Sequence, residues 1–140
     1  MGSPSANALA AFAKTLNGSM LVPTDAGYDE ARALWNGDID RRPAVIAQCT
    51  QSADVAASIG FAREEGLEIA VRGGGHSFAG HGVVEKGLMI DLSRMRDVTV
   101  DPGARRVRCG GGTTWADLDA ATQEHALAVP GGVISHTGVA

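Results

Sequence analysis

A glycine triplet followed by a histidine is the segment of this sequence best suited to chemistry: Gly73–Gly75 precede His76 in the run Arg72–Ser77. Because glycine has no Cβ atom, successive backbone N–H groups in such a loop can converge on an anion, and a pyrophosphate is the natural guest. The adjacent histidine can be a nucleophile toward an electrophilic carbon, a general base or a metal ligand. Taken alone, such a triplet is more often a tight exit from a strand, and a loop histidine is more often a hydrogen-bonding residue.

Three well-known motifs are excluded by the residues around the triplet. A Rossmann fingerprint requires glycine at position 78, but this chain has Phe78 there. A nucleophile elbow requires glycine at position 79, but this chain has Ala79 there. A Walker loop fails because Lys86 lacks the preceding glycine spacing and no Ser or Thr follows it. Ser77 is therefore predicted to be a hydrogen-bonding loop residue and not a nucleophile.

Metal binding is not expected. His76 and His81 have an acceptable spacing for zinc, but no acidic or cysteine ligand follows at a recognised interval. The two cysteines, Cys49 and Cys109, are sixty residues apart and form neither a CxxC pair nor a disulfide framework. They are predicted to be buried, reduced thiols.

Composition and charge exclude several classes of protein. The 140 residues are 44% hydrophobic and 20% charged, which is typical of a soluble globular domain. The net charge is −4 and basic residues form nothing longer than pairs, so no nucleic-acid partner is expected. The absence of an eighteen-residue apolar stretch and of a signal-peptide pattern predicts no membrane association and a cytoplasmic location. Glycine is unevenly distributed along the chain, because 13 of the 19 glycines lie from Gly73 onward.

The first half of the chain is predicted to contain a β-α-β unit with parallel strands. Apolar residues at helical spacing predict helices, and short apolar runs predict buried strands. The expected elements are a helix capped by Ser5 and ended by Asn17–Gly18, a short helix ended by Asn36–Gly37, a strand at 44–48, a helix from near Thr50 to Gly66, and a strand at 68–72. The helix residues expected to face inward are Leu9, Phe12, Ala13, Leu16, Tyr28, Ala31, Trp35, Val55, Ile59 and Ala62.

The second half is predicted to be antiparallel, so the fold class is mixed α+β and not a doubly wound sheet. Asp101–Gly103 is a turn signal between two alternating segments, which predicts an antiparallel pair. Thr114 and Asp117 form a capping box that opens a helix. The expected elements are a loop at 72–82, a strand at 88–92, strands at 97–100 and 105–109, and a helix with Trp115, Leu118 and Ala121 inward.

The domain organisation is predicted to be simple. Residues 1–40 are expected to form a helical segment leading into one domain at 41–140. The chain ends on the apolar, glycine-rich run 131–140, which has no turn or polar tail. A fragment, incomplete at its C-terminus, is therefore expected.

Five runs of the sequence, in this order, resemble one family. They are RRPAVIAQC (41–49), SADVAASIGFAREEGLEIAVRGGGHSFAGHG (52–82), GLMIDLSRM (87–95), GGTTWADLD (111–119) and HALAVPGGVISHTGVA (125–140). They resemble the N-terminal part of the flavin-dependent oxidases of the berberine bridge enzyme and oligosaccharide oxidase type. These enzymes carry the FAD-binding PCMH-type fold of the vanillyl-alcohol oxidase superfamily.

The resemblance, which covers Thr24 to Ala140, implies FAD as the cofactor. The loop Arg72–Ser77 is expected to wrap the FAD pyrophosphate with backbone amides, and His76 to be joined covalently to the 8α-methyl carbon of the isoalloxazine ring. Such a bond raises the oxidising power of the flavin. The residues implied to bind FAD are Arg72, Gly73, Gly74, Gly75, His76, Ser77, Gly80, Gly111, Gly112, Thr113, Gly132, Ser135, Thr137 and Gly138.

Two departures from the family pattern matter. Some relatives hold the flavin by a second bond to a cysteine in the segment matching Gly132–Gly138, where this chain has Ile134. A single histidyl linkage is therefore predicted, and Cys109 lies in a predicted strand outside that segment. Relatives also continue into a substrate-binding domain that supplies the catalytic base. No catalytic residue is thus expected in these 140 residues. They are expected either to be inactive alone or to pair with the remainder of the enzyme as a second chain.

The activity implied for the parent enzyme is oxidation of an alcohol, sugar or similar C–H donor. Hydride would pass from this small-molecule substrate to FAD, with molecular oxygen as the electron acceptor. One alternative is an FAD-dependent dehydrogenase that binds its flavin without a covalent bond and uses another acceptor. A second is a non-catalytic module whose glycines serve turns and whose surface binds a protein partner; it would show no flavin absorption band.

Overall fold

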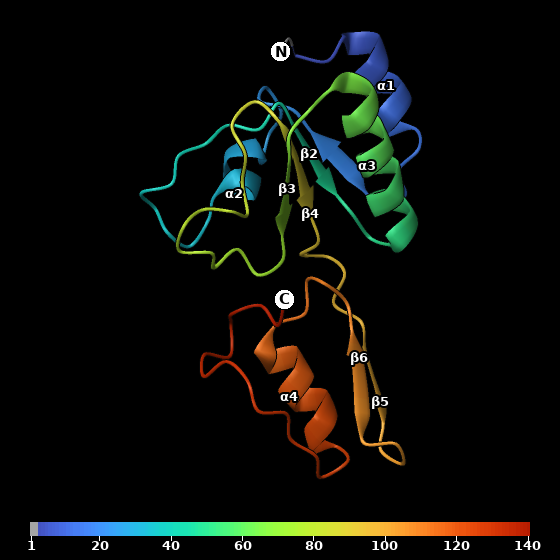
Figure 1. Ribbon diagram of the computed structural model, residues 1–140, viewed down its shortest axis with the longest axis vertical. Helices are drawn as coiled ribbons and strands as arrows, with labels where there is room; N and C mark the ends of the chain where they lie inside the picture. Colours follow the sequence, from blue (N-terminus) through green and yellow to red (C-terminus); the bar gives the residue numbers. More distant parts are fainter. Residues whose placement is uncertain (1–2) are drawn as a thin grey trace.

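Residues 3–140, which the computed structural model describes, form two sheets flanked by helices (Figure 1). The elements are α1 (Ala6–Ala13), β1 (Ser19–Leu21), α2 (Tyr28–Arg32), β2 (Val45–Gln48), α3 (Ser52–Glu65), β3 (Ile69–Arg72), β4 (Leu88–Asp91), β5 (Val98–Asp101), β6 (Arg106–Cys109) and α4 (Trp115–Gln123). The first sheet has the order β1-β2-β4-β3, and the second pairs β5 with β6. No helix within residues 3–140 is long and apolar enough to cross a membrane.

Helices cover both faces of the four-stranded sheet (Figure 1). On one face α1 and α3 meet, where the rings of Phe12 and Phe61 stack with centroids 4.2 Å apart over β2 and β4. On the other face α2 buries Tyr28, whose hydroxyl donates a 2.6 Å hydrogen bond to the carbonyl of Pro43. β2 and β4 are therefore buried from both sides, as central parallel strands usually are.

The predicted α+β class, the β-α-β unit and the antiparallel pair are confirmed. β2, α3 and β3 form the unit, with β4 between the two strands and parallel to both. β5 and β6 are antiparallel and paired from Val98 opposite Cys109 to Asp101 opposite Arg106. The sequence did not predict β1, which pairs antiparallel with β2 and is too short to show an alternating pattern.

Three residues predicted to face the core are exposed. Ala13 is exposed because α1 ends there. Ile59 is 42% exposed because the buried face of α3 is rotated by one residue from the predicted one. Trp35 is 64% exposed because α2 ends at Arg32 and Ala33 is already extended. The buried residues of α3 are Asp54, Ser58, Phe61 and Ala62.

The cysteines agree only partly with the prediction. Both are free, and Cys49 is buried in the core of the first sheet, but Cys109 at the end of β6 is half-buried. Burial raises the pKa of the Cys49 thiol, against a hydrogen bond with Ser58 that lowers it. Cys49 is therefore an inert core residue.

The buried carboxylate of Asp54 ties the N-terminal segment to the start of α3. It accepts hydrogen bonds from the backbone N–H groups of Asn17 (2.8 Å), Gly18 (3.2 Å) and Thr50 (2.9 Å), and from the Thr50 hydroxyl (3.0 Å). Burial opposes ionisation, but these hydrogen bonds outweigh it and lower the pKa of Asp54 below its ordinary value. The ionised form therefore stabilises the fold.

Replacing Asp54 by Asn should lower the free energy of unfolding at pH 7 by about 1–3 kcal/mol, because an amide offers only one acceptor oxygen to these donors. Because the folded pKa is depressed, the contribution of Asp54 is complete above the ordinary carboxyl pKa of about 4 and is lost as the pH falls through the folded value. Urea denaturation at several pH values measures both effects. Asp38→Asn, which removes an exposed carboxylate, is the control, and an equal loss in it would contradict the assignment.

Candidate functional site

The glycine loop leaves β3 at the carboxyl edge of the parallel strands and meets two other glycine segments there. A Cβ atom on Gly73 would lie 2.8 Å from the carbonyl oxygen of Gly111, and one on Gly74 would lie 2.6 Å from the Cα atom of Gly138. Real Cβ atoms do not approach backbone this closely. The triplet therefore allows three segments, far apart in the sequence, to come into backbone contact.

The segment 135–139 is held in place by the start of α4. The backbone N–H groups of Trp115 and Ala116 donate to the carbonyls of Thr137 (3.0 Å) and Ser135 (2.8 Å), and Val139 N–H donates to the Thr113 carbonyl (2.9 Å). The N–H groups of Trp115 and Ala116 are among the four that a helix N-terminus leaves unpaired. Because they are already paired with backbone, they are not free to bind an anion.

The predicted capping box at the start of α4 is confirmed, and Arg96 forms an additional contact with it. The carboxylate of Asp117 accepts from the Thr114 N–H (2.8 Å) and forms a two-point contact with the Arg96 guanidinium, with distances of 2.9 and 2.6 Å. The Arg96 contact lowers the pKa of Asp117 to about 2, although burial acts in the opposite direction. Asp117 is thus ionised at neutral pH and fixes the helix start.

His76 is oriented by its own loop. Its Nδ1 lies 2.7 Å from the carbonyl oxygen of Gly74. Because a carbonyl can only accept, Nδ1 carries the proton, and in the neutral imidazole Nε2 then carries the lone pair. Nε2 is buried and has no hydrogen-bond partner among the described residues.

Two further buried polar atoms without a partner in residues 3–140 are Arg72 Nε and Thr113 Oγ1. Arg72 is otherwise bonded, since its Nη1 donates to the Ala31 carbonyl over 2.8 Å and lies 3.9 Å from a carboxylate oxygen of Asp91. All three unpartnered atoms, including His76 Nε2, belong to residues that the sequence predicted to bind the cofactor. Buried polar groups are normally paired, so their clustering in these residues fits a ligand with polar groups.

The other predicted cofactor residues have partners within the protein. The Ser77 hydroxyl accepts from the His81 N–H (3.1 Å), as expected of a loop residue, and Gly80 closes the same turn with φ +76°. Gly132 lies against the indole of Trp115, from which a Cβ atom would be 2.5 Å away. For these three residues, as for the other residues predicted to bind FAD, the contribution to cofactor binding stays a prediction.

The structure adds Trp35 and His136 to the surroundings of His76. The ring centroid of His76 lies 6.1 Å from that of Trp35 and 5.2 Å from that of His136. Neither is among the individual residues predicted to bind FAD, although His136 lies in the segment between Gly132 and Gly138, which are. Nothing in their spacing from the glycine triplet pointed to the contact.

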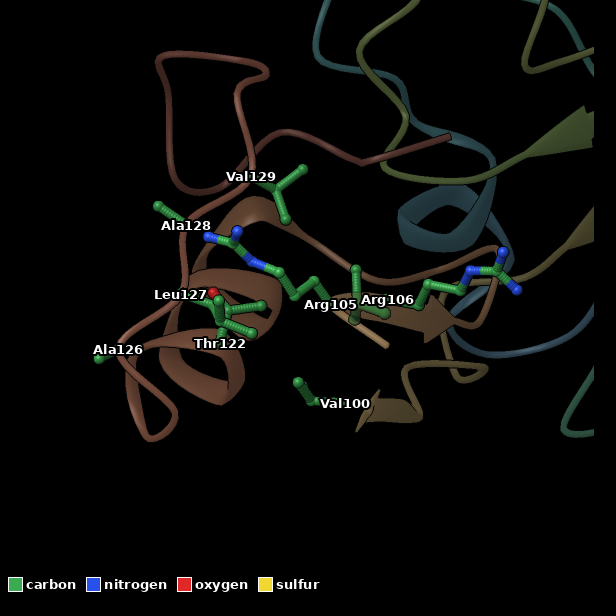
Figure 2. Close-up of a pocket in the computed structure, with 9 residues that line it drawn as sticks. Val100, Arg105, Arg106, Thr122, Ala126, Leu127, Ala128 and Val129 are labelled. Carbon is green, nitrogen blue, oxygen red and sulfur yellow. The ribbon is translucent and has the colours of Figure 1, made fainter. Parts of the chain in front are cut away.

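A hollow of about 550 Å³ lies beside Arg72 at the carboxyl ends of β2, β3 and β4. Ligands of parallel α/β sheets commonly bind at this edge. A second hollow, of about 200 Å³, lies between the β5–β6 hairpin and the segment after α4, where Val100, Thr122 and Val129 line it (Figure 2). Its lining includes none of the predicted cofactor residues, so it is separate from the site around His76.

The fold and the site define an FAD-binding α+β domain. Residues 43–140 match the FAD binding domain family, and the chain belongs to this family. FAD is therefore its cofactor, and the residues around the three unpartnered polar atoms fit it.

Individual relatives agree with this assignment. The chain is 35% identical over 124 residues to (R)-6-hydroxynicotine oxidase of Paenarthrobacter nicotinovorans, a match that covers 89% of this chain and 27% of that enzyme. The crystal structure of 6-hydroxy-D-nicotine oxidase from Arthrobacter nicotinovorans superposes with a TM-score of 0.86 and the same coverage, at 35% identity. Phl p 4, a grass pollen allergen with glucose dehydrogenase activity, superposes with a TM-score of 0.85 at 25% identity, covering 94% of this chain and 30% of that protein. The chain thus spans about a quarter to a third of the length of these relatives.

Replacing Gly74 by Ala should push the glycine loop away from Gly138 and lower the FAD content of the protein at least about tenfold, with a loss of stability of about 1–3 kcal/mol. The ratio of flavin to protein absorbance after purification measures the first effect, and thermal unfolding measures the second. Gly37→Ala is the matched control, because a Cβ atom at Gly37 meets nothing within 4 Å. Full flavin content in Gly74→Ala would show that this contact does not shape the site.

Proposed function

We propose that this chain is the FAD-binding part of an FAD-dependent oxidase with a single histidyl linkage to its cofactor. The parent enzyme oxidises an alcohol, a sugar or a similar C–H donor, and molecular oxygen is the electron acceptor. When bound, FAD supplies the two-electron acceptor for the hydride. The small-molecule substrate and its catalytic base belong to the part of the enzyme beyond these 140 residues.

The protein residues have distinct roles in holding the cofactor. Backbone amides of Gly73–Ser77 face the pyrophosphate, where the absence of side chains permits close approach. The Arg72 guanidinium supplies positive charge, and its buried Nε remains available as a donor. Thr113 offers a buried hydroxyl from the second glycine segment. Together these groups would bind the anionic part of FAD and orient the cofactor.

The main support for the proposed covalent linkage is that His76 Nε2 has no hydrogen-bond partner among the described residues. The hydrogen bond to Gly74 holds the proton on Nδ1, so Nε2 is the nucleophilic nitrogen. Nε2 is buried, and no side chain or backbone group among the described residues competes for its lone pair. A nucleophile held beside a bound cofactor reacts as if at high local concentration.

The cysteine distribution supports a single bond. Ile134 occupies the position where bicovalent relatives carry cysteine, and neither Cys49 nor Cys109 lies in the 131–138 segment. Cys49 is enclosed in the core. His76 is therefore the sole attachment residue.

Denaturation with acid tests the linkage in the purified protein. The flavin of the unaltered protein should precipitate with the polypeptide, whereas His76→Ala should release all of its flavin to the supernatant. His81→Ala, which changes an exposed histidine of the same loop, should behave like the unaltered protein. Flavin found only in the supernatant of the unaltered protein would disprove the covalent bond and leave FAD binding intact.

A second candidate is an FAD-dependent dehydrogenase that uses an acceptor other than oxygen. It is favoured by the similarity to Phl p 4, whose described activity is that of a glucose dehydrogenase. The two candidates differ in the reoxidation step. Rapid reoxidation of the reduced flavin by oxygen, with hydrogen peroxide as product, supports the oxidase, and reoxidation only by an added acceptor supports the dehydrogenase.

A further inference from the structure

The imidazole of His76 is in contact with an exposed tryptophan. The rings of Trp35 and His76 form an offset stack with an interplanar angle of 26°, and the ring of His136 is tilted against His76 at 55°. Both centroid separations, 6.1 and 5.2 Å, lie in the range of attractive ring pairs. Trp35 is nonetheless 64% exposed and contributes little to the core.

The segment that carries Trp35 is bound along the glycine loop. Trp35 N–H donates to the Gly75 carbonyl (3.0 Å), and the Asn36 side chain donates to the Phe78 carbonyl (2.9 Å). A few residues later, Arg41 donates to the Gly80 carbonyl (2.8 Å). The stack is thus built into the loop that presents His76, although the segment precedes the residues that match the FAD binding domain family.

We propose that Trp35 is a positioning residue for the attachment of FAD to His76, an inference that rests on the proposed histidyl linkage. The hydrogen bond from Nδ1 to Gly74 fixes one point of the imidazole but leaves its plane free to turn. The indole of Trp35 fixes that plane, and His136 adds a second ring contact. Nε2 is then held in one direction.

Attachment needs this direction because it is a bond-forming step. A bond forms between Nε2 and the 8α-methyl carbon of FAD, one C–H bond of that methyl group breaks, and the imidazole loses its Nδ1 proton. The electron pair of the C–H bond and two protons remain on the flavin, which is thereby reduced. Molecular oxygen then reoxidises the flavin and is reduced to hydrogen peroxide. A misdirected Nε2 slows bond formation without weakening the binding of FAD.

The rate of attachment tests the proposal. Full-length apoprotein is mixed with FAD, samples are denatured at intervals, and flavin fluorescence on the denatured polypeptide is compared with the total flavin bound before denaturation. Trp35→Leu, which keeps bulk but removes the aromatic ring, should slow attachment roughly three- to tenfold, the size expected for the loss of one ring pair. Initial FAD affinity should stay within about twofold. Trp35→Phe should restore most of the rate.

A control on the same loop separates this role from general loop stability. Phe78 is 79% exposed, and the ring pairs that His76 forms within the described residues are with Trp35 and His136, so Phe78→Leu should attach FAD at the unaltered rate. Attachment at the unaltered rate in Trp35→Leu, or equally slow attachment in Trp35→Phe, would overturn the role of Trp35 alone. No covalent flavin in the unaltered protein would overturn the histidyl linkage and this proposal together.

Discussion

The backbone contact between Gly74 and Gly138 is the constraint on which the site depends. It joins the loop after β3, part of the first sheet, to the segment that follows α4. A side chain at either position would separate the two segments. His76 lies two residues after Gly74, and His136 lies two residues before Gly138. The contact between the two glycines therefore also sets the distance between the histidine rings.

The segment that contains Gly138 is held in position by the start of α4. Arg96 and Thr114 hold the Asp117 carboxylate, and the helix start then binds the carbonyls of Ser135 and Thr137. In Rossmann and Walker sites the helix N-terminus binds phosphate directly. Here the N–H groups at the start of α4 bind the protein's own backbone carbonyls, so they are not available to an anionic cofactor. In the function proposed above, the glycine loop and Arg72 take that role instead.

The sequence was informative wherever function and fold depend on local pattern. The β-α-β unit, the turn at Asp101–Gly103 and the Thr114 cap are local signals, and all three are present in the structure. β1 and the place of Trp35 beside the glycine loop were missed because each depends on a tertiary partner: β1 exists through its pairing with β2, and the backbone of Trp35 is bound to Gly75. The same reason explains why composition located the glycine segments but not their mutual contact.

The unpartnered polar atoms connect the stability of the fold to its cofactor. A buried donor or acceptor without a partner costs about 1–3 kcal/mol, so a ligand that supplies the missing partners stabilises the folded state. A cofactor that pairs with Arg72 Nε and Thr113 Oγ1, and a covalent bond that uses His76 Nε2, would remove this cost in the folded state only. FAD binding and folding are then linked equilibria, so residues that shape the glycine contact act on both at once.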